Sequence, residues 1–171
     1  MPISCREGFS MRRQTPLLFA ALVLTAVVIS PRARAVELTR QDGTTKTIWD
    51  GIYTEEQARR GEQVFKTECS YCHRDDLAGG FLDDGVGRAP ALAGPRAFGS
   101  SLVDRWKDLT LTDMVASIAA TMPQPKPASL TLQAYVDLVG YLFSKNGLPA
   151  GSLELPPDAD ALGRLLITEK Q

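Results

Sequence analysis

The clearest periodic pattern in the chain lies over residues 132–145, where apolar side chains recur at intervals of three and four positions. Thr131 precedes this stripe as a candidate N-cap, and Asn146-Gly147 follows it with the residue types that end a helix in the left-handed conformation. The pattern predicts a helix over 132–145 that buries one face. Its apolar members are Leu132, Tyr135, Val136, Leu138, Val139, Leu142 and Phe143.

A second helix is predicted over residues 55–67. Thr54 is the candidate N-cap, and Gln57 three residues later gives the pattern of a capping box. Apolar residues are sparse in this segment, which suggests a narrow buried face. Gly61 lies in mid-helix, where glycine is less favourable than alanine by about 1 kcal/mol, so we expect a close helix crossing there.

A third helix is predicted over residues 111–120. Thr110 and Asp113 form another capping-box pattern, and apolar residues follow at helical spacing. Met114 belongs to this buried stripe, so core packing is its expected role. We find no convincing pair of strands anywhere in the sequence. The chain is therefore predicted to be all-α.

Residues 1–35 have the composition of a secretory signal peptide. Arginines at 12–13 precede an apolar run over 17–29, which is shorter than the roughly 20 residues that a membrane span needs. A small-x-small motif then ends at Ala35. We predict cleavage after this residue and export to the periplasm. Met11 is an alternative initiator, because the basic region of a signal peptide normally follows closely on the start.

The charge balance changes once the predicted signal peptide is removed. The 171-residue chain, long enough for one domain, has 19 basic and 20 acidic residues. Five of the basic residues and one of the acidic residues lie within 1–35, which leaves a net charge of −5 on the mature chain. A mildly acidic surface argues against a nucleic-acid partner, whose phosphates require a basic face. We also expect no membrane span after cleavage.

The candidate chemistry lies in the motif Cys69-Ser70-Tyr71-Cys72-His73. In an oxidising compartment a disulfide is the ordinary alternative for such a cysteine pair, but the histidine completes C-x-x-C-H, the signature of covalent haem attachment. A thioredoxin-like enzyme would show a βαβ pattern, and a zinc site would need more Cys or His ligands than the mature chain contains. We predict one haem c, bound through Cys69 and Cys72, with His73 as an axial ligand of the iron.

The second axial ligand is predicted by elimination. His73 is the only histidine, so two imidazoles from this chain cannot bind the iron, and Met/His ligation is the common alternative in cytochromes c. Among the methionines of the mature chain, Met122 lies directly before the proline-rich residues 123–127, which exclude a helix. A rigid loop suits a weak thioether ligand, so Met122 is the predicted iron ligand. Gap-filling or simple exposure is the alternative role for a methionine in a loop.

Several of these residues together resemble class I cytochrome c. Gly61 and Phe65 precede the first haem cysteine by eight and four residues, as a glycine and an aromatic residue do in that family. The first and last helices of the family cross at that glycine, against a face matched here by Leu138 and Tyr141. The resemblance implies a class I cytochrome c fold, with three to four helices around one covalently bound haem.

The resemblance also implies further roles at the site. In Pro90-Ala91-Leu92, Pro90 would accept the N–H of His73 and fix its tautomer, while Leu92 would line the haem. Met122 would be the sulfur ligand. The match spans residues 54–146, so residues 36–53 form an N-terminal extension. Residues 147–171 form a C-terminal extension that we expect to pack on the core.

Four residues outside the motifs leave alternatives open. Trp106 and Phe98 suit either the haem edge or ordinary core packing. Arg88 and Arg96 suit either a haem propionate or the solvated surface that is the commoner place for arginine.

The expected function follows from the ligands. An iron with both His and Met ligands has no open position for a substrate, so we expect an electron carrier and not an enzyme. Its partners would be a dehydrogenase as donor and an oxidase or reductase as acceptor. The alternatives are a cytochrome subunit of a larger periplasmic oxidoreductase complex, and a haem enzyme or sensor in which Met122 leaves the iron.

Overall fold

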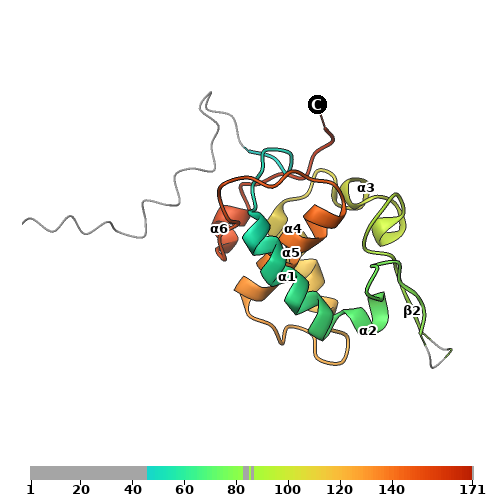
Figure 1. Ribbon diagram of the computed structural model, residues 1–171. Helices are drawn as coiled ribbons and strands as arrows, with labels where there is room; N and C mark the ends of the chain where they lie inside the picture. Colours follow the sequence, from blue (N-terminus) through green and yellow to red (C-terminus); the bar gives the residue numbers. More distant parts are fainter. Residues whose placement is uncertain (1–45, 83–84, 86, 171) are drawn as a thin grey trace, which may run out of the picture. The chain divides into compact units, whose positions relative to one another are not determined.

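The computed structural model describes residues 46–82, 85 and 87–170. The predicted signal peptide, residues 1–35, and residues 36–45 of the N-terminal extension lie outside the described residues. Figure 1 shows the order of the elements. They are α1 (Glu55–Glu68), α2 (Ser70–His73), β1 (Gly80–Phe81), β2 (Arg88–Ala89), the 3-10 helix η2 (Ala97–Gly99), α3 (Leu102–Trp106), α4 (Leu111–Thr121), α5 (Leu132–Lys145) and α6 (Ala159–Leu162).

The three longest described helices, α1, α4 and α5, agree with the sequence prediction. Their ends differ from the predicted ends by at most one residue, and the predicted caps are present at Thr54, Thr110 and Thr131. The capping box of α4 is also present, because the Asp113 side chain accepts from the Thr110 backbone N–H at 2.9 Å. Within the described part of the chain, no helix is both long and apolar enough to span a membrane.

Two details of the prediction are wrong. The first is the absence of strands, since β1 and β2 form an antiparallel pair with Gly80 opposite Ala89 and Phe81 opposite Arg88. Two residues per strand are too few to produce an alternating pattern that the sequence would reveal. The second is the expected number of helices, because α2, α3 and α6 bring the described α-helices to six.

The capping box predicted for α1 is incomplete. Thr54 Oγ1 accepts from the Gln57 backbone N–H at 3.0 Å, as predicted. The Gln57 side chain is fully buried and turns inward, where its oxygen accepts from Leu155 N at 2.8 Å and its nitrogen donates to Leu155 O at 3.0 Å. This glutamine therefore joins α1 to the segment that follows α5.

Helices α1 and α5 cross each other (Figure 1), and Gly61 lies at their closest contact. A Cβ atom at Gly61 would lie 1.9 Å from the carbonyl oxygen of Asp137 and 2.9 Å from Tyr141 Cβ, so only glycine permits this approach. One turn further along, the rings of Phe65 and Tyr141 meet with centroids 5.4 Å apart. The crossing fixes the end of α1, where the candidate haem cysteines begin.

A polar network reinforces the same crossing. Arg60 donates through Nε to Asp137 Oδ2 at 3.0 Å and through Nη2 to Glu154 Oε2 at 2.8 Å. The Asp137 side chain is 7% exposed and also accepts from Gln57 and Gln133. Since each carboxylate has several donors, the burial of Asp137 is compensated. The network connects α1, α5 and the C-terminal segment, residues 147–170.

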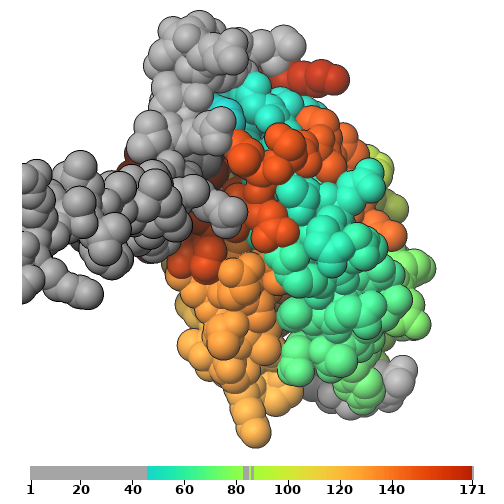
Figure 2. All heavy atoms as spheres, turned by 60° about the vertical axis from the view of Figure 1, so that its left-hand side comes forward, coloured from blue at the N-terminus to red at the C-terminus, as the bar shows by residue number. Residues whose placement is uncertain are grey.

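The segment after α5 packs back onto the domain. Gly151 N donates to Tyr53 O at 2.7 Å, Leu111 N donates to Leu165 O at 3.0 Å, and Ile167 N donates to Leu109 O at 3.0 Å. On the face shown in Figure 2, this orange-to-red segment lies against the cyan-to-teal residues that precede and form α1. Its side chains complete the core, because four of them are at most 1% exposed: Leu155, Leu162, Leu165 and Ile167.

We expect Leu165→Ala to lower the free energy of unfolding by about 3 kcal/mol, because it removes buried methyl groups and leaves a cavity. Leu165 is 0% exposed, whereas the neighbouring Leu166 is 42% exposed. The matched control Leu166→Ala should change the stability by about 0.5 kcal/mol or less. Urea unfolding of both variants measures the difference. Equal losses for the two variants would contradict the core position of Leu165.

Candidate functional site

The turn between α1 and α2 places the three motif residues together. Cys69 ends α1, and its carbonyl oxygen accepts from the backbone N–H groups of Cys72 at 3.2 Å and of His73 at 3.0 Å. This single helical turn brings both thiols to one side of the chain. The two cysteines are half-buried, and they are not joined as a disulfide. Burial raises the pKa of the Cys69 thiol to about 11, so the thiol is protonated at neutral pH.

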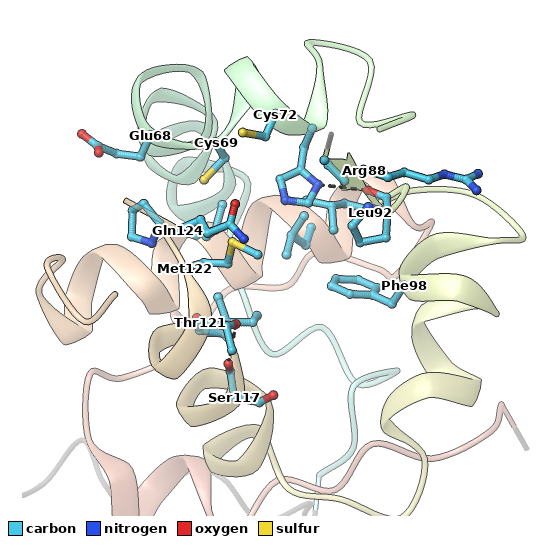
Figure 3. Close-up of a pocket in the computed structure, with 18 of the residues that line it drawn as sticks. Glu68, Cys69, Cys72, Arg88, Leu92, Phe98, Ser117, Thr121, Met122 and Gln124 are labelled. Carbon is cyan, nitrogen blue, oxygen red and sulfur yellow. Dashed lines mark hydrogen bonds between the residues drawn. The ribbon is translucent and has the colours of Figure 1, made fainter. Parts of the chain in front are cut away.

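All six residues predicted for the site line one cavity of about 340 Å³. They are Cys69, Cys72, His73, Pro90, Leu92 and Met122. In Figure 3, Cys69 and Cys72 lie on the side of the cavity formed by α1 and α2. Met122 lies below Cys69 in the same view, at the end of α4. The fold thus brings together residues from three separate stretches of the chain.

His73 is buried and held in one orientation. Its ring Nδ1 lies 2.9 Å from the carbonyl oxygen of Pro90. Because a carbonyl only accepts, Nδ1 carries the proton, and Nε2 of the neutral ring keeps its lone pair. Burial lowers the pKa of His73, although the Pro90 carbonyl acts in the opposite direction, so the ring is neutral at neutral pH. A neutral imidazole with a free Nε2 is the form that binds a metal.

Backbone contacts hold the Pro90–Leu92 segment beside His73. Leu92 N donates to Leu77 O at 2.8 Å. From α5, Asn146 Nδ2 donates to Leu92 O at 2.9 Å and to Leu142 O at 2.8 Å. The sequence identified Asn146 only as a helix-ending residue. Its side chain also ties the end of α5 to the wall of the cavity.

Met122 is the C-cap of α4 and is half-buried. Its N–H donates to Ile118 O at 2.8 Å, so the last turn of α4 delivers it to the cavity. Met114 is 0% exposed and belongs to the hydrophobic core, as its helical position predicts. Of the two described methionines, only Met122 lines the cavity.

An aromatic pair forms another part of the cavity wall. Phe98 and Trp106 both line it and meet edge to face, with ring centroids 5.9 Å apart. Trp106 is 4% exposed, and its Nε1 is the one buried side-chain polar atom of the described residues that has no hydrogen-bond partner. An unpaired buried N–H is unfavourable by about 1–3 kcal/mol, so a ligand acceptor is expected there.

Two arginines are among the lining residues, although the guanidinium of Arg88 points away from the cavity (Figure 3) and lies 5.5 Å from the centroid of the Phe81 ring. The second is Arg105, whose guanidinium lies 4.7 Å from the centroid of the Trp106 ring. Arg96 does not line the cavity. The sequence did not predict a role for Arg105, because nothing in its local pattern distinguishes it from a surface arginine. A mainly apolar lining that includes Trp106, with its unpaired N–H, and the cation Arg105 fits a flat macrocycle that carries carboxylates.

Comparisons with known proteins agree with this chemistry. Residues 56–142 match the family model described as cytochrome c oxidase, cbb3-type, subunit III. Photosystem II extrinsic protein V of Pyropia yezoensis is 33% identical, over 70% of this chain and 77% of the relative. Photosystem II extrinsic protein V of Parasynechococcus marenigrum (strain WH8102) is 35% identical, over 67% of this chain and 70% of the relative. No solved structure matches the chain. The chain therefore belongs to the family of cbb3-type cytochrome c domains, and so to the c-type cytochromes, and it carries one covalently bound haem c.

Proposed function

We propose that this chain is a periplasmic electron-transfer protein in which His73 and Met122 would be the two ligands that the chain supplies to the haem iron. Cys69 and Cys72 form the thioether bonds. The observation that carries this proposal is the common cavity of these four side chains, together with the hydrogen bond that leaves Nε2 of His73 free. If both side chains bind the iron, the chain itself would leave no place on the metal for a substrate.

The remaining residues of the cavity bind and orient the haem, which supplies reversible one-electron chemistry when bound. Pro90 holds the His73 ring through its carbonyl oxygen and keeps the proton on Nδ1. Leu92, a buried lining residue, would pack against the ring system and help to exclude water. Trp106 Nε1 and Arg105 are the groups best placed to meet the haem carboxylates, because one lacks a partner and the other is charged.

The extent of the haem domain is part of this proposal. Residues 54–146 hold the haem, while residues 36–53 and 147–171 are extensions, and the described part of each supports the core. Export follows from the predicted signal peptide over residues 1–35. In the periplasm the protein would take electrons from a dehydrogenase and pass them to an oxidase or reductase.

The second candidate function is that of a cytochrome subunit held on a larger redox complex. The relatives favour it, because their names describe an extrinsic protein of photosystem II. Purification from the native source at low ionic strength distinguishes the two functions. A free carrier elutes as a small protein. A subunit remains with a large partner in a fixed ratio.

Absorption spectroscopy of the purified holoprotein, with and without carbon monoxide, tests the proposed ligation. We expect a low-spin ferric haem with a sulfur-to-iron charge-transfer band in the near red. The ferrous protein should resist carbon monoxide, since Met122 occupies the position that the gas needs. A high-spin ferric spectrum with ready carbon monoxide binding would contradict the proposal and favour a haem enzyme or sensor.

A further inference from the structure

One buried side chain outside the cavity donates a hydrogen bond to the backbone of the proposed iron ligand. Tyr135 lies near the start of α5, is 4% exposed, and is not a lining residue of the cavity. Its hydroxyl donates to the backbone carbonyl oxygen of Met122 at 2.8 Å. The contact therefore joins α5 to the backbone of Met122 without involving its sulfur atom.

The loop that carries Met122 has few other ties. Met122 N donates to Ile118 O at 2.8 Å, and Ala128 N donates to Ala119 O at 2.8 Å, so both of these bonds connect the loop to α4. Prolines at 123, 125 and 127 contribute no N–H groups that could add backbone bonds. Within the described part of the chain, Met122 has a hydrogen bond to α4 through its N–H and one from α5 through its carbonyl oxygen. The bond from α5 is the one that Tyr135 donates.

We propose that Tyr135 is a positioning residue for the sulfur ligand, an inference that rests on the proposed role of Met122. By holding the Met122 carbonyl against α5, Tyr135 keeps the loop closed and the thioether within reach of the iron. A neutral thioether is a weak ligand, so its competition with other ligands depends on how readily the loop opens. Loop opening breaks the Tyr135 bond, which therefore favours the methionine-bound state.

The test compares two tyrosine variants of the holoprotein. Tyr135→Phe removes one hydroxyl and keeps the ring that packs in the core. Tyr53→Phe is the matched control, because Tyr53 is also buried and its hydroxyl donates to a backbone carbonyl, Leu148 O, at 2.8 Å. That bond joins the residues before α1 to the segment after α5, and it does not involve the ligand loop. Both variants lose one buried hydrogen bond, so urea unfolding should register a similar loss for each.

Imidazole titration of the ferric proteins, followed at the near-red band, provides the decisive readout. Imidazole binds by displacing the thioether. We expect the apparent affinity for imidazole to be about fivefold higher in Tyr135→Phe than in the wild type, as the loss of one hydrogen bond implies. Tyr53→Phe should bind imidazole like the wild type. A near-red band in all three proteins with equal imidazole affinities would overturn the role of Tyr135. A wild type without that band would instead overturn the ligation by Met122 on which the role depends.

Discussion

Met122→Ala is expected to abolish the near-red charge-transfer band and convert the ferric haem from low spin to high spin. Alanine offers no ligand atom, and the chain has no second histidine to replace the sulfur. Met114, the other described methionine, is fully buried in the core and does not line the cavity. The iron should then accept carbon monoxide in the ferrous state. The reduction potential should fall, because thioether ligation favours ferrous iron.

Met114→Leu is the matched control for this change. It replaces a buried methionine by a residue of similar volume, which usually lowers stability by less than about 1.5 kcal/mol. Its spectrum and potential should equal those of the wild type. If Met122→Ala kept the charge-transfer band, or if Met114→Leu lost it, the assignment of Met122 would be wrong. Absorption spectroscopy and potentiometric titration measure both properties.

Gly61→Ala is expected to lower the free energy of unfolding by about 3 kcal/mol, at the upper end of overpacking substitutions. The added Cβ would lie 1.9 Å from the Asp137 carbonyl oxygen, and backbone on the partner helix cannot move aside as a flexible side chain can. The Asp137 side chain is itself bonded to Arg60, which limits any separation of α1 and α5. Because α1 leads directly into Cys69, the strain also reaches the haem attachment.

Gly140→Ala provides the comparison on the facing helix. A Cβ at Gly140 would meet Gln57 Cγ at 3.4 Å, an ordinary van der Waals distance. Alanine is the better helix former by about 1 kcal/mol, so this variant should be as stable as the wild type or slightly more stable. Urea unfolding of the two holoproteins measures the contrast. Equal stabilities for Gly61→Ala and Gly140→Ala would contradict the close crossing at Gly61.

The long helices could be predicted because their signals are local and repeated. In α5, seven apolar residues at helical spacing and caps at both ends agree with each other, and the predicted bounds are the observed ones. Helices α2, α3 and α6 have four or five residues, and β1 and β2 have two. Elements of that length depend on tertiary contacts for their stability, so their sequences carry no periodic signal.

Gln57 illustrates how tertiary structure overrides a local signal. Its spacing from Thr54 predicted a capping box, which would have kept the side chain at the helix end. The structure buries it between α1 and Leu155, because the returning C-terminal segment presents a backbone N–H and a carbonyl that only an amide side chain can satisfy together. The two residues are 98 positions apart.

The haem chemistry of this protein can be deduced from the amino-acid sequence alone. Residue types and their spacing can be read without knowledge of the fold. They include the motif Cys69-x-x-Cys72-His73, the single histidine, and Met122 before its proline-rich segment. The contacts that support this chemistry become visible in the folded chain. The packing leaves Nε1 of Trp106, a lining residue of the cavity, without a hydrogen-bond partner, and it places the Tyr135 hydroxyl on the Met122 carbonyl. Such contacts depend on how helices pack, and packing brings together residues whose local sequence patterns carry no trace of one another.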